Sequence, residues 1–374
     1  MRIAYLVNAP RKHLTGAAGR ALTLAGGARE RGDHAVILGP AGSGLQLAAA
    51  QRDIEFEAAP FSALNGGAEI RTILARHDVD VVHAMSTVPA VLANPRLLVR
   101  GASRRRAIFV SVVVDPDSPL VYADARPRPF ATWLRARLLA HVSPALSGVF
   151  AVSGPVCEKL RARGVRGVVT LGGAAIDLAQ LSQRATEPIE LPAGRPRIGS
   201  AVGQLEPLKG IDVLLEAFVR VVEVHPDATC LIAGEGSQHE ALTRLAHQLG
   251  IAKSVHFLGY LQNPAPFLAA LDLHVSPSLT EGLGTVTAQA MALGAPVIAT
   301  DVGGASDVVS NGVSGLLVRP ADPDALADAM IRLLGDQALA SSLSAKGREL
   351  VLAHHSAERF VDETWAHYKR AVTW

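Results

Sequence analysis

The chain has 374 residues, of which 49% are hydrophobic and 19% are charged, with 36 Lys and Arg against 34 Asp and Glu. This length exceeds one ordinary core and favours two domains of roughly 150 to 200 residues, while the apolar fraction excludes a disordered or fibrous protein. A formal charge of +2 provides no global field that would recruit nucleic acid.

Two cysteines, Cys157 and Cys230, are far apart and form no CxxC motif. This usage argues against a disulfide framework and against a thiolate zinc site, and it is typical of a reducing compartment. The apolar start of the chain ends at Asn8 and Pro10, which makes it too short for a signal peptide. No other window is long enough for a spanning helix, so we expect a cytoplasmic protein.

The first half of the chain alternates short apolar runs with helix-like stretches. A Gly-rich loop at 15–19 follows the first run and leads into a helix that ends near Gly32. The expected strands are 3–7, 35–38, 79–83, 107–114 and 148–152. Apolar strands separated by helices predict a parallel sheet that is covered on both faces.

The alternation breaks over 182–196, where three prolines and the lack of periodicity predict a linker. It then restarts with expected helices at 212–224 and 238–249. The expected strands of this half are 198–202, 229–233, 254–257, 273–275 and 296–299. We therefore expect an N-terminal α/β domain over 1–181 and a second over 197–355. Ligands should gather at the carboxyl ends of the strands of each sheet.

The most informative stretch runs from Asp272 to Thr300. It reads as a strand and a turn, after which Glu281, Gly282 and Gly284 open a helix. Glycines there let the backbone approach a ligand closely, and the N–H groups at the start of a helix favour an anion. By itself this pattern predicts a phosphate-binding loop.

In its length and order, this stretch resembles the donor-binding signature of the family 4 retaining glycosyltransferases. Residues 202–212 resemble that family's G-R-L-x-x-x-K-G-x-D segment, 231–236 its L-x-I-x-G-x-G segment and 255–259 its V-x-F-x-G segment. The match covers roughly residues 196–320. It is looser in the first domain, where Gly16-Ala17 and 81–84 resemble a Gly-Gly loop and a V-V-H-A strand.

The resemblance implies the GT-B architecture, in which two Rossmann-like doubly wound domains face each other across a cleft. The first would bind the acceptor and be completed by a C-terminal helix at about 356–374, and the second would bind a nucleotide-diphospho-sugar. It also implies metal-independent glycosyl transfer with retention at the anomeric carbon. No cofactor is then expected, and the acceptor could be a saccharide, a lipid-linked molecule or a small molecule.

Residue roles carry over from the resemblance only where the motifs match. Glu281 would accept hydrogen bonds from hydroxyls of the donor sugar, and Lys209 would neutralise the leaving diphosphate. His83 and Asp115 are candidates for contact with the acceptor or the sugar, although a histidine at a strand end is also commonly satisfied in the core. The residues expected to line the donor are Gly16, Ala17, Gly203, Gln204, Gly234, Gly236, Tyr260, Leu261, Gly282, Leu283, Gly284, Thr285 and Gln289.

Three positions depart from the family pattern. Gln204 replaces an arginine, Gln289 replaces the second glutamate of the E-x7-E motif, and Val114 stands where a histidine is common. An amide cannot supply the forked charged bond of arginine, nor the several acceptor sites of a carboxylate. These changes indicate a retuned donor pocket. They also leave open a degenerate binding subunit that supports a partner enzyme, and a sugar-nucleotide epimerase is a third alternative.

Two further patterns each allow more than one interpretation. Asp115-Pro116-Asp117 resembles a metal-binding D-x-D motif, but a turn or an acceptor loop is favoured, and thirteen histidines without paired spacing predict no metal site. Arginines concentrate over 96–137, and Phe130, Trp133, Leu134 and Leu138 recur there at helical spacing. That segment fits a core helix with a solvated face, a groove for an anionic acceptor, or peripheral contact with the inner face of a membrane.

Overall fold

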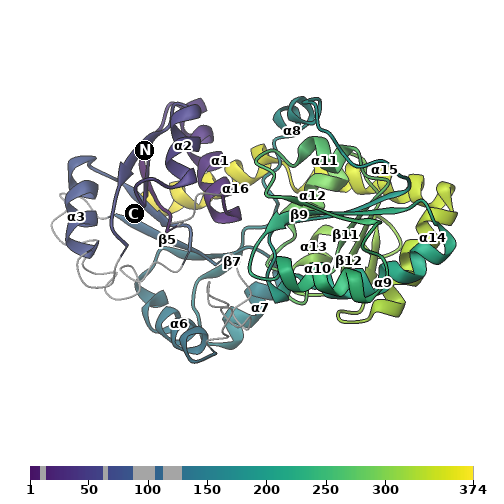
Figure 1. Cartoon of the computed structure of the whole chain (residues 1–374). Coiled ribbons are helices and arrows are strands. Elements are labelled where there is room, and N and C mark those ends of the chain that lie inside the picture. Colours follow the sequence, from purple (N-terminus) through teal and green to yellow (C-terminus); the bar gives the residue numbers. More distant parts are fainter. Residues whose placement is uncertain (9–13, 62–65, 87–105, 113–128, 374) are drawn as a thin grey trace. The chain divides into compact units, whose positions relative to one another are not determined.

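The computed structural model describes residues 1–8, 14–61, 66–86, 106–112 and 129–373 (Figure 1). The described residues form two compact units. One contains the residues up to 175 together with 357–373, and the other contains 176–356. Both are α/β units built on a parallel sheet, so the predicted fold class is confirmed. Among the described residues, no helix has the length and apolar character needed to cross a membrane.

The first unit has a seven-stranded sheet in the order β3-β2-β1-β4-β5-β6-β7, with every pairing parallel. Its strands are β1 (Arg2–Leu6), β2 (His34–Gly39), β3 (Glu55–Ala58), β4 (Val81–Ala84), β5 (Ala107–Val112), β6 (Gly148–Ala151) and β7 (Val168–Thr170). Its helices are α1 (Gly16–Glu30), α2 (Gly44–Gln51), α3 (Gly66–Arg76), α6 (Pro129–Val142), the 3-10 helix η1 (Ser143–Ala145), α7 (Gly154–Ala162) and α16 (Ala357–Val372). The sequence did not predict β3 or β7, because β3 alternates Glu with apolar residues at a sheet edge and β7 has only three residues.

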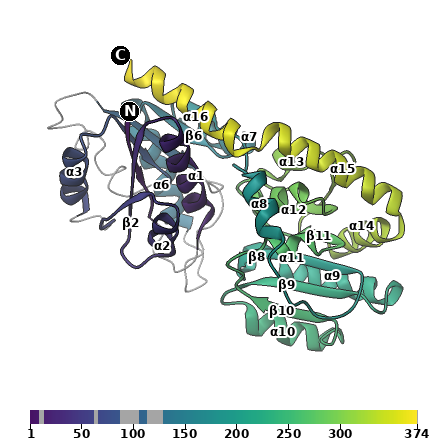
Figure 2. The same cartoon turned by 90° about the horizontal axis from the view of Figure 1, so that it is seen from above.

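The last helix of the chain, α16, packs against α1 in this first unit (Figure 2). A Cβ atom added to Gly27 of α1 would lie 2.6 Å from Cγ1 of Val361, so the glycine permits a close helix crossing. Two turns earlier on α1, the guanidinium carbon of Arg20 lies 4.2 Å from the ring centroid of Phe360 on α16. The indole N–H of Trp365 donates to Asp33 at 2.7 Å. These contacts fasten the C-terminal helix to residues near the start of the chain.

The second unit has a six-stranded parallel sheet in the order β10-β9-β8-β11-β12-β13. Its strands are β8 (Arg197–Gln204), β9 (Thr229–Glu235), β10 (Val255–Gly259), β11 (Leu273–Ser276), β12 (Val297–Thr300) and β13 (Leu316–Val318). Its helices are α8 (Leu178–Ala185), the 3-10 helix η2 (Pro207–Lys209), α9 (Ile211–Val224), α10 (His239–Gln248), α11 (Ala265–Ala269), α12 (Thr285–Ala292), α13 (Ala305–Val308), α14 (Pro323–Gly335) and α15 (Gln337–His354).

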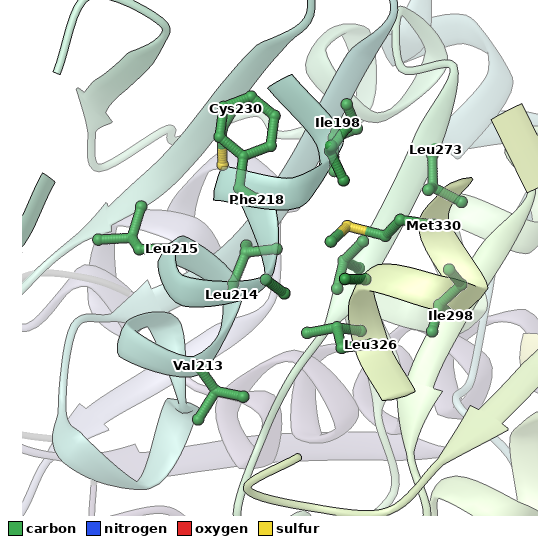
Figure 3. Packing of buried hydrophobic residues seen from close by; sticks show 14 of the residues in the cluster. Ile198, Val213, Leu214, Leu215, Phe218, Cys230, Leu273, Ile298, Leu326 and Met330 are labelled. Carbon is green, nitrogen blue, oxygen red and sulfur yellow. The ribbon is translucent and has the colours of Figure 1, made fainter. Parts of the chain in front are cut away.

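The core of the second unit lies between its sheet and the helices α9 and α14. Leu214 and Phe218 of α9 and Met330 of α14 are fully buried against strand residues such as Ile198 and Leu273 (Figure 3). These residues come from positions spaced three or four apart on the helices, as a helix with one apolar face requires. This buried cluster holds the helices against the strands of the sheet.

The start of the second unit differs from the predicted linker. Residues 182–185 are the end of α8, which begins after Asp177, whose carboxylate accepts the N–H of Gln180 at 2.9 Å. The amide of Asn263 donates to the carbonyl of Arg184 at 2.9 Å and ties this helix to the second unit. Asp177 is a recognisable N-cap residue and could have predicted this helix. The prolines after residue 186 favoured a linker instead.

Candidate functional site

At the centre of the second sheet, the order in which successive strands are added to the sheet reverses. Strands β8 and β11 are neighbours, but the chain continues from β8 to β9 on one side and from β11 to β12 on the other. At such a switch point the two following loops diverge and leave a crevice at the carboxyl ends of the strands. Here those loops are 205–210, after β8, and 277–284, after β11.

An ion pair joins the two loops. Nζ of Lys209 lies 2.9 Å from Oε2 of Glu281, and the two side chains are 27% and 22% exposed. The backbone N–H of Gly282 donates to Oε1 of Glu281 at 3.1 Å, and the hydroxyl of Ser278 lies 3.4 Å from Oε2. Glu281 is therefore oriented by three groups but remains within reach of solvent. When a ligand enters, the cation of such a pair can bind an anionic group of the ligand in place of the carboxylate. The carboxylate can then accept hydrogen bonds from hydroxyls of the ligand.

Two glycines allow these loops to approach so closely. Gly210 has φ +62°, and a Cβ atom there would lie 2.1 Å from the carbonyl oxygen of Pro277. Gly303, which follows β12, has φ +52°, and a Cβ atom there would lie 1.7 Å from the carbonyl oxygen of Glu281. Backbone is the obstacle in both cases, and L side chains also disfavour these φ values. Glycine is thus a steric requirement at both positions.

Helix α12 starts beside Glu281. Its N-cap residue is Gly284, with φ +92°, and glycine offers no side chain to bond the N–H groups of the first turn. These groups and the helix dipole favour an anion at this end. Thr285 and Gln289 lie one turn apart on the same face of the helix, and both are partly exposed. A small pocket here is lined by Glu281, Leu283, Gly284 and neighbouring residues of β12 and α13.

The adjoining strand ends bring the remaining predicted residues of this unit to the same edge. Gly203 has φ +61° and pairs with Gly234 beyond an irregularity between β8 and β9, where Gln204 lies opposite Glu235. A Cβ atom on Gly236 would lie 2.4 Å from the carbonyl oxygen of Leu205. The backbone N–H of Tyr260, next to Leu261, donates to Oε1 of Glu235 at 3.4 Å.

Of the site residues predicted in the first unit, Gly16 and Ala17 lie at the start of a helix. Gly16 is the first residue of α1, directly after its capping residue Thr15, and a Cβ atom there would meet nothing within 4 Å. Ala17 follows it and is partly buried. Asp115 and Val114 lie outside the described residues.

His83 is a core residue, which corrects its assignment to the acceptor or sugar site. Its side chain is fully buried in β4, with Nδ1 2.5 Å from the hydroxyl of Tyr368 and Nε2 2.7 Å from the hydroxyl of Ser111. Burial, and secondarily the charge of Arg20, lower its pKa to about 3, so the ring is neutral. The reason is that β4 is an inner strand and α16 covers it, which leaves both ring nitrogens engaged within the unit.

The structure describes part of α6, the helix for which the sequence allowed contact with a membrane or with an anionic acceptor. On α6, Leu134 and Leu138 are 40% and 38% exposed, and Arg137 between them is also exposed. Ala136 and Leu139 are buried. The side chains of Phe130 and Trp133 lie outside the described residues.

Sequence reasoning missed two contributors to the site. Ser278 contacts the carboxylate of Glu281, and Gly303 allows the backbone of Glu281 to pass. The consecutive glycines at 303 and 304, four residues after the end of a predicted strand at 296–299, were an available signal for Gly303. No sequence signal distinguished Ser278 from Ser276, two residues earlier.

Comparison with known proteins agrees with this geometry. Residues 183–350 match the model of a family described as glycosyl transferases group 1. Over 185 residues the chain is 37% identical to the D-inositol 3-phosphate glycosyltransferase of Corynebacterium urealyticum, covering 45% of this chain and 43% of that protein. Over 164 residues it is 39% identical to the GDP-mannose-dependent monoacylated alpha-(1-6)-phosphatidylinositol monomannoside mannosyltransferase of Corynebacterium glutamicum, covering 41% of this chain and 42% of that protein. The chain therefore spans less than half the length of either relative.

A solved structure resembles the whole chain. The crystal structure of Anabaena Alr3699/HepE in complex with UDP and glucose aligns with a TM-score of 0.81 and 20% identity. The alignment covers 99% of this chain and 100% of that one. This likeness supports the same two-unit GT-B fold, whereas the family model matches residues of the second unit alone.

Proposed function

This chain belongs to the group 1 glycosyltransferases through residues 183–350, and from that premise we propose that it transfers a sugar from a nucleotide-diphospho-sugar to an acceptor. The proposal includes retention at the anomeric carbon and no metal ion at the donor. The observation that carries it is the pairing of Lys209 with Glu281 at the switch point, next to the start of α12. The crystal structure of Anabaena Alr3699/HepE, which has a similar fold, contains UDP and glucose, and this supports the proposal of such a donor.

Each group has a defined task in this proposal. The diphosphate competes with Glu281 for the ammonium of Lys209 and is held by the N–H groups at the start of α12. Glu281, still oriented by Gly282 and Ser278, then accepts hydrogen bonds from the sugar hydroxyls. Stabilisation of the charge that grows on the leaving diphosphate is the main catalytic effect, and a preorganised cation supplies it without a metal ion.

Retention is proposed because Glu281 is committed as an acceptor of hydrogen bonds. One oxygen of this carboxylate accepts from Lys209 and the other accepts from the N–H of Gly282, so both oxygens are already used in binding and orientation. We therefore assign proton acceptance to the leaving phosphate, on the same face of the sugar as the incoming hydroxyl. No pair of carboxylates of the kind used in glycoside hydrolysis is required.

The first test measures donor binding. Nucleoside diphosphates and nucleotide sugars are screened for a rise in the unfolding temperature, in EDTA, because a ligand of the native state raises apparent stability. Lys209→Ala should weaken the best ligand by about ten- to a hundredfold, as expected for about 1.5 to 3 kcal/mol from a charged hydrogen bond. Lys253→Ala, on an exposed lysine of the same unit, is the matched control. Equal affinities in the two variants would show that the site is misplaced.

Turnover separates the proposed enzyme from its alternatives. Glu281→Gln should reduce transfer of the sugar more than it reduces binding of the nucleoside diphosphate, because Glu281 contacts the sugar. A donor that binds but is not consumed with any saccharide, lipid-linked or small-molecule acceptor would favour a supporting subunit. Interconversion of the donor without acceptor would instead identify an epimerase.

We also propose that the exposed apolar residues of α6 contact a membrane when the acceptor is lipid-linked. Leu134 and Leu138 flank the exposed Arg137, a combination that suits an anionic lipid surface. The full chain should then sediment with anionic vesicles at low salt, and a Leu134→Ser, Leu138→Ser variant should not. Equal sedimentation of both proteins would exclude this contact surface.

A further inference from the structure

A separate group of ligand atoms lies in the first unit, on three elements distant in sequence. His34 is the first residue of β2, Glu55 is the first residue of β3, and His77 follows the end of α3. Nε2 of His34 lies 2.9 Å from Oε2 of Glu55, and Nδ1 of His77 lies 3.9 Å from Oε1 of the same carboxylate. One nitrogen or oxygen from each residue lies within 4.8 Å of the others.

The register of the sheet explains this meeting. β2 and β3 are parallel, with Val36 opposite Glu55. Because side chains alternate across a strand, His34 shares the face of Val36 and reaches Glu55 diagonally. The backbone N–H of His77 donates to Ile73, so His77 continues the last turn of α3. The imidazoles of His34 and His77 are stacked, with centroids 6.1 Å apart.

We propose that His34, Glu55 and His77 bind a divalent transition-metal ion of the zinc type. Two imidazoles and one carboxylate form a ligand set that such ions prefer, whereas magnesium and calcium prefer oxygen alone. In a tetrahedral zinc site with bonds of about 2.0 to 2.1 Å, neighbouring ligand atoms are roughly 3.3 Å apart. The nitrogen of His34 is 2.9 Å from Oε2 of Glu55 and the nitrogen of His77 is 3.9 Å from Oε1, so each histidine is near that spacing from one oxygen of the carboxylate.

The surroundings suit a bound ion. Oε1 of Glu57 lies 3.2 Å from Nε2 of His77, on the opposite side of the ring from the nitrogen that faces Glu55. The two groups do not have hydrogen-bond geometry, but a carboxylate beside a ligating histidine can turn toward the second ring nitrogen and orient the ring. Glu57 is held in turn by Arg76, whose guanidinium is 2.7 Å away. The side chain of His77 is 11% exposed and that of His34 is 52% exposed, so the site has a sheltered ligand and an open side.

The position indicates a structural or regulatory ion. His34 and Glu55 lie at the amino ends of their strands, whereas the loop before Gly16 follows the carboxyl end of β1. These are opposite ends of the same parallel sheet. Within the described part of the chain β3 is the edge strand and pairs with β2 alone, so an ion would join this edge to the neighbouring strand and to the end of α3. The inference is independent of the sugar-transfer proposal, which requires no metal ion.

The test uses the full chain without a histidine tag, after removal of metal by a chelator. Zn²⁺ titrated by calorimetry should bind at one ion per chain, and Co²⁺ should give the visible absorption of a tetrahedral site. His34→Ala and Glu55→Gln should each weaken Zn²⁺ by at least tenfold. His247→Ala, on an exposed histidine of α10, should leave the affinity unchanged.

A second measurement protects the test against misfolded variants. Zn²⁺ should raise the unfolding temperature of the unaltered protein and leave that of His34→Ala unchanged, while the two metal-free proteins unfold at similar temperatures because His34 is half exposed. The proposal is overturned if no Zn²⁺ binds. It is also overturned if His34→Ala and His247→Ala bind Zn²⁺ as tightly as the unaltered protein, since the ion would then lie elsewhere.

Discussion

Replacement of Gly303 by alanine probes how the site is held together. The new Cβ atom would lie 1.7 Å from the carbonyl oxygen of Glu281, about 1.3 Å closer than the 3.0 Å that real Cβ atoms keep. The obstacle is backbone, so the Glu281 loop must move by about that distance. A displacement of about 1 Å in a positioned group can cost about a hundredfold in rate, or about 2.7 kcal/mol of barrier. We expect such a loss of kcat/KM in Gly303→Ala.

Gly312→Ala is the matched control for this experiment. Gly312 also has a positive φ, +71°, but a Cβ atom there would meet nothing within 4 Å. Both variants should lose about 1 to 2 kcal/mol of stability from the left-handed backbone, and only Gly303→Ala should also lose donor binding and transfer. Stability is measured by chemical unfolding and donor affinity by calorimetry. Equal binding of the nucleotide by both variants would refute the argument that Gly303 positions Glu281.

Three other results are expected. In the family that the sequence resembles, the glutamate replaced by Gln289 accepts hydrogen bonds from the ribose hydroxyls. Gln289→Glu should therefore tighten a ribonucleotide about fivefold relative to its 2′-deoxy analogue, because a carboxylate offers more acceptor sites. Calorimetry with both nucleotides tests this, and equal changes in their affinities would remove Gln289 from the ribose. Burial lowers the pKa of His83 to about 3 and of His274 to about 4, so protons taken up on unfolding below pH 6.5 should reduce stability by about 2 kcal/mol per histidine between pH 7 and 5. His83→Gln should remove its share of that slope in chemical unfolding, and an unchanged slope would contradict its burial as a neutral ring. On α1, Gly26→Ala should stabilise by up to ~1 kcal/mol, since a Cβ atom there meets nothing within 4 Å, and Gly27→Ala should destabilise against Val361; thermal unfolding of the pair tests the packing of α16.

The candidate site of the second unit could be predicted from sequence because it is built locally. Lys209 and Glu281 each follow a recognisable apolar strand, and glycines at Gly210 and Gly284 mark the turns that they need. Parallel strands place such loops at one edge of a sheet, so strand order alone brings the two residues near each other. What the pattern could not show is their direct contact at 2.9 Å, which depends on side-chain geometry.

The proposed metal cluster shows the opposite case. His34, Glu55 and His77 come from three elements, and their spacing matches no short motif. Only the pairing register of β2 and β3, with the end of α3 over the same face, brings them together. One of those elements, β3, was itself absent from the sequence prediction. A site assembled from tertiary structure in this way leaves no trace in local spacing.

His83 shows why a matched motif and a functional role must be argued separately. Its strand was identified correctly, and in an open sheet the end of β4 would face a ligand. The hydroxyl that holds Nδ1 belongs to Tyr368, which is 285 residues away on the last helix of the chain. A neutral ring fixed between two hydroxyls can neither accept a proton at ordinary pH nor turn toward a substrate without leaving one of them unpaired. If the first unit binds the acceptor, as we propose, other residues than His83 must contact it.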